Sequence, residues 1–168
     1  MSEEFNWEEY NKEQKLREEE IEKQKERLLE ILKQFDKWLE AKGFKEKTVI
    51  THLSNIAFYL ENFFFSYYVN LDDDEAPTVE EAYEGFSYFF GNFFIRKCLW
   101  SNEKSTRQYA ASFKRFYTFL YEKEMVSQDI LQCVKQIFKE ELPQWVEKVN
   151  RYNRGEMTES EMMDFWFD

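Results

Sequence analysis

The side chains that most often carry out catalysis are scarce in this chain. His52 is its only histidine, so a metal site built from several histidines is excluded, and one imidazole remains for a Ser-His or Cys-His pair. Nothing in the sequence places a nucleophile next to His52, so we expect a partly exposed helix histidine. The stretch from Gly85 to Phe89 begins like a nucleophile elbow, but it lacks the second glycine and the strand-turn-helix context of that motif. We therefore expect no catalytic residue.

Binding sites for cofactors are equally unsupported. The chain has no glycine-rich phosphate loop. The run Asp72-Asp73-Asp74-Glu75 lacks the alternating ligands and central glycine of a calcium loop, so we expect a solvated loop. The many glutamates cannot form the paired Glu-x-x-His sites of helical bundles with one histidine. The sequence predicts a protein without enzymatic activity, cofactor, metal or evident small-molecule substrate.

The two cysteines, Cys98 and Cys133, form no C-x-x-C pair. We expect both to be buried as small hydrophobic side chains, although a disulfide between them remains open. We find no signal peptide and no apolar span of transmembrane length. A reducing, cytoplasmic location without membrane contact is the expectation.

The composition favours one all-α domain. The 168 residues suffice for one core, and 20% aromatic residues with only four glycines and two prolines favour long helices over a turn-rich β architecture. The protein is acidic, with a net charge of −11. It would repel a polyanion unless its basic residues were gathered on one face.

Apolar spacing and end signals predict the helices and the domain limits. Thr78 with Glu81, and Thr158 with Glu161, match capping boxes, and Pro143 predicts a bend or a restart. The expected helices are Glu3 to Lys42, Lys47 or Thr48 to Phe65, Thr78 to Leu99, one capped by Ser105, Ser127 to Gly155, and Thr158 to Asp168, with a loop from Asn70 to Pro77. We expect residues 1–27 to be an exposed charged helical extension, 28–130 a helical domain, and 131–168 a C-terminal helical extension with an acidic-aromatic tail.

Two stretches of the chain carry motifs in an order shared with a known family. The first joins the helix end Trp38-Leu39, the turn Gly43 to Thr48 and an apolar helix through Phe63. The second is Ser105-Thr106 followed by the basic-aromatic run Tyr109 to Leu120. Together, over roughly Leu28 to Ile130, they resemble the N-terminal core-binding, SAM-like domain of tyrosine recombinases and phage integrases.

That resemblance implies a four- to five-helix orthogonal bundle that clamps one side of duplex DNA. In the family, the catalytic arginines, histidines and nucleophilic tyrosine belong to a separate C-terminal domain, for which we find no room in this chain. The resemblance therefore implies a non-catalytic clamp module, acting as a weak DNA-binding or recombination-accessory protein.

Local charge supports contact with DNA. Between Phe94 and Lys123, seven basic and two acidic residues give a local charge of +5, which leaves −16 for the rest. Lys104, Arg107 and Lys114 lie within about a third of a helical turn of each other. The candidate DNA-binding residues are these three, Arg115, and residues at two helix starts that would offer exposed amides: Lys45, Lys47, Thr48, Lys104, Ser105, Arg107, Lys114 and Arg115. The alternative is a solvated helix face paired with the acidic tail.

A second hypothesis is a protein-interaction, regulatory or oligomerisation module that has lost DNA binding. The segments Phe63 to Phe65 and Phe86 to Phe94 hold more aromatic residues than one helix stripe can bury, and leftover apolar surface commonly marks an interface. The candidate partner-binding residues in the tail are Phe165, Trp166 and Phe167. An extra helix folded onto its own domain is an equal alternative. A third hypothesis places the acidic tail over the basic ridge formed by Lys104, Arg107 and Lys114, where it would suppress DNA binding.

Overall fold

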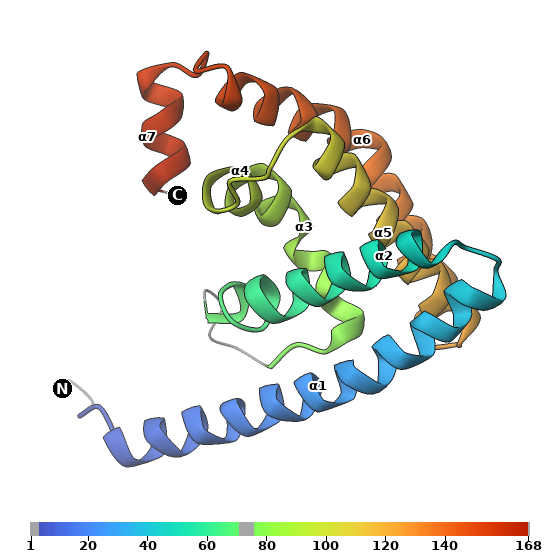
Figure 1. Ribbon diagram of the computed structural model, residues 1–168. Coiled ribbons are helices and arrows are strands. Elements are labelled where there is room, and N and C mark those ends of the chain that lie inside the picture. Colours follow the sequence, from blue (N-terminus) through green and yellow to red (C-terminus); the bar gives the residue numbers. More distant parts are fainter. Residues whose placement is uncertain (1–3, 71–75, 168) are drawn as a thin grey trace.

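A computed structural model describes residues 4–70 and 76–167, and within these ranges it contains helices and turns but no strand (Figure 1). The expected all-α fold class is confirmed. The α-helices are α1 (Trp7–Ala41), α2 (Glu46–Phe58), α3 (Phe86–Tyr88), α4 (Phe94–Lys97), α5 (Glu103–Glu122), α6 (Gln128–Asn153) and α7 (Glu159–Phe167). The π-helices are η1 (Tyr59–Phe64) and η4 (Phe89–Phe93), and the 3₁₀ helices are η2 (Tyr68–Asn70) and η3 (Val79–Gly85). The run Asp72 to Glu75 lies outside the described residues. No helix in the described ranges is both long and apolar enough to span a membrane.

The helices wrap around one aromatic core (Figure 1). The long α1 runs along one side, and α2 turns back across it at a tight turn. There Gly43 has φ +85°, and the Phe44 amide donates to the Leu39 carbonyl at 3.3 Å. The helix α5 crosses and contacts α2, and it packs most extensively against α6. The chain from η3 to α4 fills the space between these layers.

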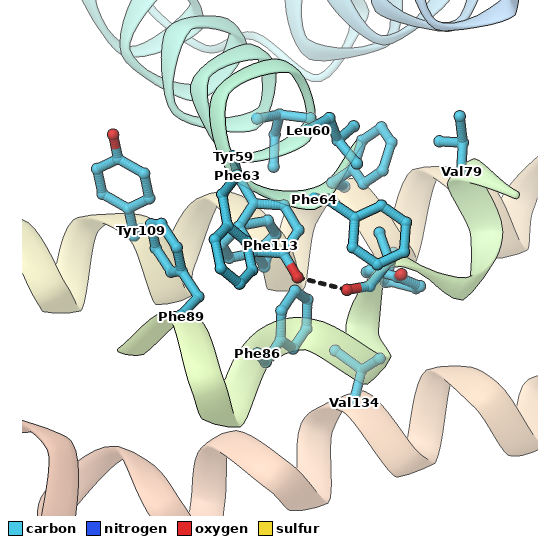
Figure 2. Close-up of a cluster of buried hydrophobic side chains, with 14 of the residues drawn as sticks. Tyr59, Leu60, Phe63, Phe64, Val79, Phe86, Phe89, Tyr109, Phe113 and Val134 are labelled. Carbon is cyan, nitrogen blue, oxygen red and sulfur yellow. Dashed lines mark hydrogen bonds between the residues drawn. The ribbon is translucent and has the colours of Figure 1, made fainter. Parts of the chain in front are cut away.

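The core is built mainly from phenylalanine and tyrosine rings (Figure 2). Tyr59 lies 4.7 Å from Phe113 and 4.9 Å from Phe89 between ring centroids, and Phe86 lies 4.5 Å from Phe113. Residues at helical spacing in the third expected helix are all buried: Ala82, Phe86, Phe89, Phe90 and Phe93. Leu29 on α1, by contrast, is 58% exposed.

The aromatic runs do not leave the excess that we expected at the surface. Phe63, Phe64 and Phe65 are all buried, and so are all five phenylalanines from Phe86 to Phe94. The reason is the two π-helices, whose wider turns bring consecutive rings toward the same core. In this way Phe63 of η1 meets Phe93 at a centroid distance of 4.8 Å.

The single third helix that we expected is instead a chain of η3, α3, η4 and α4. Two buried tyrosine hydroxyls explain the tight first segment. Tyr59 donates to the Ala82 carbonyl at 2.5 Å (the dashed line in Figure 2), and Tyr117 donates to the Glu80 carbonyl at 3.0 Å. These carbonyls therefore do not need an α-helical partner four residues on. The expected capping box also fails, because the Thr78 hydroxyl donates to the Glu81 carboxylate rather than accepting from the Glu81 amide.

The C-terminal helices follow the expected end signals. Ser127 caps α6 by accepting from the Ile130 amide at 3.2 Å, and α6 continues through Pro143 without the expected restart. The Thr158–Glu161 capping box forms in both directions, with Thr158 Oγ1 accepting from the Glu161 amide at 3.1 Å and the Thr158 amide donating to Glu161 Oε2 at 2.7 Å. A capped short helix, α7, results.

The N-terminal and C-terminal parts of the chain both pack against the central helices. On α1, the Arg17 guanidinium donates to the Val69 carbonyl and Ile21 is buried, so α1 joins the body before residue 28. Leu131, Val134 and Phe138 place α6 in the main core. The final helix, α7, packs in a separate small cluster of Ile95, Val149 and Phe165.

Candidate nucleic-acid interface

Three of the candidate basic residues project from one exposed face of α5. Lys104, Arg107 and Lys114 are all exposed. Arg107 forms one ion pair, with Glu103 at 3.7 Å, in which both side chains are more than half exposed. Such a pair contributes little to stability, so a phosphate can compete for the guanidinium. Lys114 Nζ lies 6.0 Å from the centroid of the Phe138 ring. The face is therefore positive and open to solvent.

The start of α5 differs from the expected one. Asn102, not Ser105, is the N-cap: its Oδ1 accepts from the Ser105 amide at 2.8 Å, and Ser105 Oγ accepts from the Asn102 amide at 2.9 Å. The Ser105 amide is thus already paired and is not available to a phosphate. Asparagine is as good an N-cap as serine, and the polar residue three positions later completes the box. The N-cap therefore lies three residues before the expected one.

The start of α2 is more suited to an anion. The helix begins at Glu46, with Lys45 at the N-cap and no side chain accepting from the first amides. Thr48, expected to open the helix, lies in its first turn and is partly buried, whereas Lys45 and Lys47 are exposed. Uncapped amides with two nearby ammonium groups form an environment that favours phosphate.

Arg115 does not belong to the exposed face. Its guanidinium stacks 4.3 Å from the centroid of the Phe44 ring and donates to His52 Nε2, which links α5 to the start of α2. Lys104 and Arg115 are eleven positions apart, which corresponds to about 16 Å along α5. The two groups of candidate residues, at the start of α2 and at the start of α5, are therefore separated by roughly this length.

His52 is buried, not partly exposed as expected: 4% of it is exposed. Because the Arg115 guanidinium can only donate, His52 Nε2 must accept, and the proton resides on Nδ1. Nδ1 then donates to Ser112 Oγ at 2.6 Å, and Ser112 Oγ donates to the Gln108 carbonyl at 3.0 Å. Burial, and secondly the charge of Arg115, lower the pKa of His52 to about 4.

The His52–Ser112 pair has the wrong polarity for nucleophilic catalysis. A general base accepts the proton of the serine hydroxyl, whereas here histidine donates and the serine proton points to a main-chain carbonyl. Ser112 is also completely buried. The pair ties α2 to α5, and no spacing in the sequence indicates a partner sixty residues away.

The cysteines and acidic residues form no second site. Cys98 is buried as expected, whereas Cys133 is exposed, and both are free, which excludes the disulfide alternative. Burial raises the pKa of the Cys98 thiol to about 12. Within residues 4–70 and 76–167, no three histidine, cysteine, aspartate or glutamate side chains gather closely enough to hold a metal ion.

The acidic-aromatic tail packs on its own domain. Phe165 is 3% exposed, and its carbonyl accepts from Asn92 Nδ2 at 2.9 Å. The Arg96 guanidinium lies 5.1 Å from the centroid of the Trp166 ring, and Phe167 is 84% exposed. Because α7 lies against α4 and α6, it does not cover Lys104, Arg107 or Lys114. The hypothesis that the tail shields the basic ridge is therefore wrong for the structure described.

Comparisons with models of protein families, with curated proteins and with solved structures found no match to this chain.

Proposed function

We propose that the chain is a non-catalytic module that binds duplex DNA weakly through the exposed face of α5, as the clamp domains it resembles would do. One observation carries the proposal. Lys104, Arg107 and Lys114 project together to solvent within a segment of local charge +5. Side chains of this kind position a protein on the phosphate backbone and carry no direct sequence information.

The start of α2 adds a second point of contact. Its uncapped amides and the ammonium groups of Lys45 and Lys47 suit a phosphate. The separation of about 16 Å from the start of α5 is on the scale of the major-groove width, about 12 Å, so the two ends would meet different phosphates of one duplex.

The remaining charge of the chain opposes binding, so the affinity depends strongly on salt. Three phosphate contacts predict a fall in the association constant of about 40-fold when the salt concentration rises from about 50 to about 200 mM. A loss of this size separates phosphate contact from apolar association, which salt strengthens or leaves unchanged.

Fluorescence anisotropy with a labelled duplex of about 20 base pairs, measured at both salt concentrations, tests the proposal. Arg107→Glu with Lys114→Glu should abolish binding. Lys33→Glu with Lys37→Glu is the matched control, because it makes the same change in net charge at exposed positions on α1. No binding by the parent protein at low salt, or equal losses in both variants, would refute the proposal.

A second candidate function is association with another copy of the chain through the outward face of α7. There Met163, Trp166 and Phe167 are exposed around a hollow of about 310 Å³. Exposed aromatic residues of this kind commonly carry the energy of an interface. Sedimentation velocity should show a dimer that Phe167→Ser removes and Leu29→Ser, an exposed position on α1, preserves. A monomer at all concentrations would exclude this function.

A further inference from the structure

A groove of about 680 Å³ lies between α6, η4 and α7, away from the basic residues of α5. Gly91 of η4 and Trp145 of α6 lie side by side in its lining, and α7 contributes Asp164 and Phe165. The volume falls within the range of about 300 to 1,000 Å³ that is typical of ligand sites. Neither the proposed DNA contact nor the outward face of α7 uses this groove.

Trp145 contributes an unpaired donor to the groove. The residue is 6% exposed, and its ring is fixed by stacking on Phe90, with centroids 4.8 Å apart and planes 14° apart. No acceptor for its Nε1–H lies within hydrogen-bond distance in the described part of the chain, and Nε1 is not among the fully buried atoms that lack a partner, so this N–H is open to the groove. The indole N–H of a largely buried tryptophan usually donates a hydrogen bond. The partner is therefore to be sought in the groove.

Gly91 keeps this donor open. A Cβ atom at this position would lie 3.6 Å from Trp145 Nε1, which is ordinary van der Waals contact. Alanine would therefore fit without a clash and would cover the indole nitrogen. Glycine inside a helical segment also costs about 1 kcal/mol relative to alanine. Neither packing nor helix formation requires a glycine here, whereas access to the indole N–H does.

The charges in the lining define the ligand. Arg151 is paired with Glu161 at 2.7 Å, so their charges cancel. Of the other charged residues in the lining, Lys148 is positive and Glu147 and Asp164 are negative. Lys148 is itself held at 2.6 Å by the Gly91 carbonyl. The resulting excess of negative charge disfavours a carboxylate or a phosphate as the acceptor. An uncharged acceptor with a neighbouring cation fits better.

We propose that the groove binds a peptide segment. A main-chain carbonyl of the peptide accepts from Trp145 Nε1–H, and a lysine or arginine side chain of the peptide lies against Glu147 and Asp164. Phe165, whose ring has Lys148 Nζ 4.7 Å from its centroid, supplies an apolar wall for the stem of that side chain.

The smallest probe with this chemistry is N-acetyl-lysine methylamide, which carries two peptide carbonyls and one ammonium group. Its roughly 14 non-hydrogen atoms at about 0.3 kcal/mol each predict a Kd near 1 mM. The five tryptophans give separate indole N–H resonances in a ¹H–¹⁵N spectrum, and Trp145→Phe assigns one of them. The Trp145 resonance should move and saturate with this probe and should not move with N-acetyl-glutamate methylamide.

Two variants make the test specific. Gly91→Ala should remove the response while leaving the fold as stable as before or more stable. Glu147→Lys with Asp164→Lys should reverse the preference toward the glutamate probe, whereas Glu13→Lys with Glu30→Lys, exposed on α1, should not. The proposal is overturned if the Trp145 resonance moves with neither probe, if it responds equally to both, or if Gly91→Ala responds as the parent does.

Discussion

Acidification should destabilise the protein through His52. The folded state holds its imidazole neutral, with a pKa of about 4, whereas a histidine in the unfolded chain has its ordinary pKa of 6.5. Between these values the unfolded chain binds the proton and the folded chain does not, so stability falls as the pH is lowered from about 7 to 4. The shift corresponds to about 3 kcal/mol at pH 4.

Urea unfolding followed by tryptophan fluorescence at pH 4 and pH 7 measures this loss. Carboxylates whose pKa is lowered in the folded state, such as Glu80 beside Arg27, also lose stabilisation as the pH falls, so the control is His52→Gln, which cannot be protonated. The difference in unfolding free energy between parent and variant should change by about 3 kcal/mol across the range. If the unfolding free energies of parent and variant fall equally between pH 7 and pH 4, the imidazole is not held neutral. An NMR titration of this single histidine with a midpoint near 6.5 would show the same.

Three further predictions concern packing and reactivity. Gly85→Ala should lower the free energy of unfolding by about 3 kcal/mol and Tm by about 10 °C, because a Cβ atom there would lie 2.6 Å from the Tyr59 hydroxyl. Phe165→Ala should accelerate hydrogen exchange in α7 by about 100-fold, since it empties the small cluster under that helix, whereas Phe167→Ala should not. A thiol reagent should modify the exposed Cys133 rapidly in the native protein and leave the other cysteine, which is buried, until unfolding.

Two helix ends could be predicted from local signals. The box between Thr158 and Glu161 and the serine cap of α6 lie where expected and pair groups three residues apart, whereas the Thr78–Glu81 box has the same spacing and does not form. The buried stripe of the third segment was predictable for a related reason. Apolar spacing indicates which side chains face the core even where the backbone departs from α-helical geometry.

Long-range pairing limits what could be predicted of the candidate site. Arg115 was a candidate for DNA contact, but its neighbours are Phe44, in the turn before α2, and His52 on α2. His52 looked exposed because its partner Ser112 is sixty residues away. The groove beside Trp145 gave no sequence signal, since it depends on a glycine and an indole from two helices that meet only after folding.

The 3₁₀ geometry of η3 has a consequence for the order of folding. Tyrosines from η1 and α5 donate hydrogen bonds to two of its carbonyls, so the geometry depends on distant parts of the chain. The segment can therefore form only after those elements have met. We expect it to form after the main barrier. In stopped-flow experiments, Tyr117→Phe should then speed unfolding while refolding keeps the rate of the parent. A slower refolding rate would instead place η3 in the nucleus, which would make the least regular part of the chain the first to become fixed.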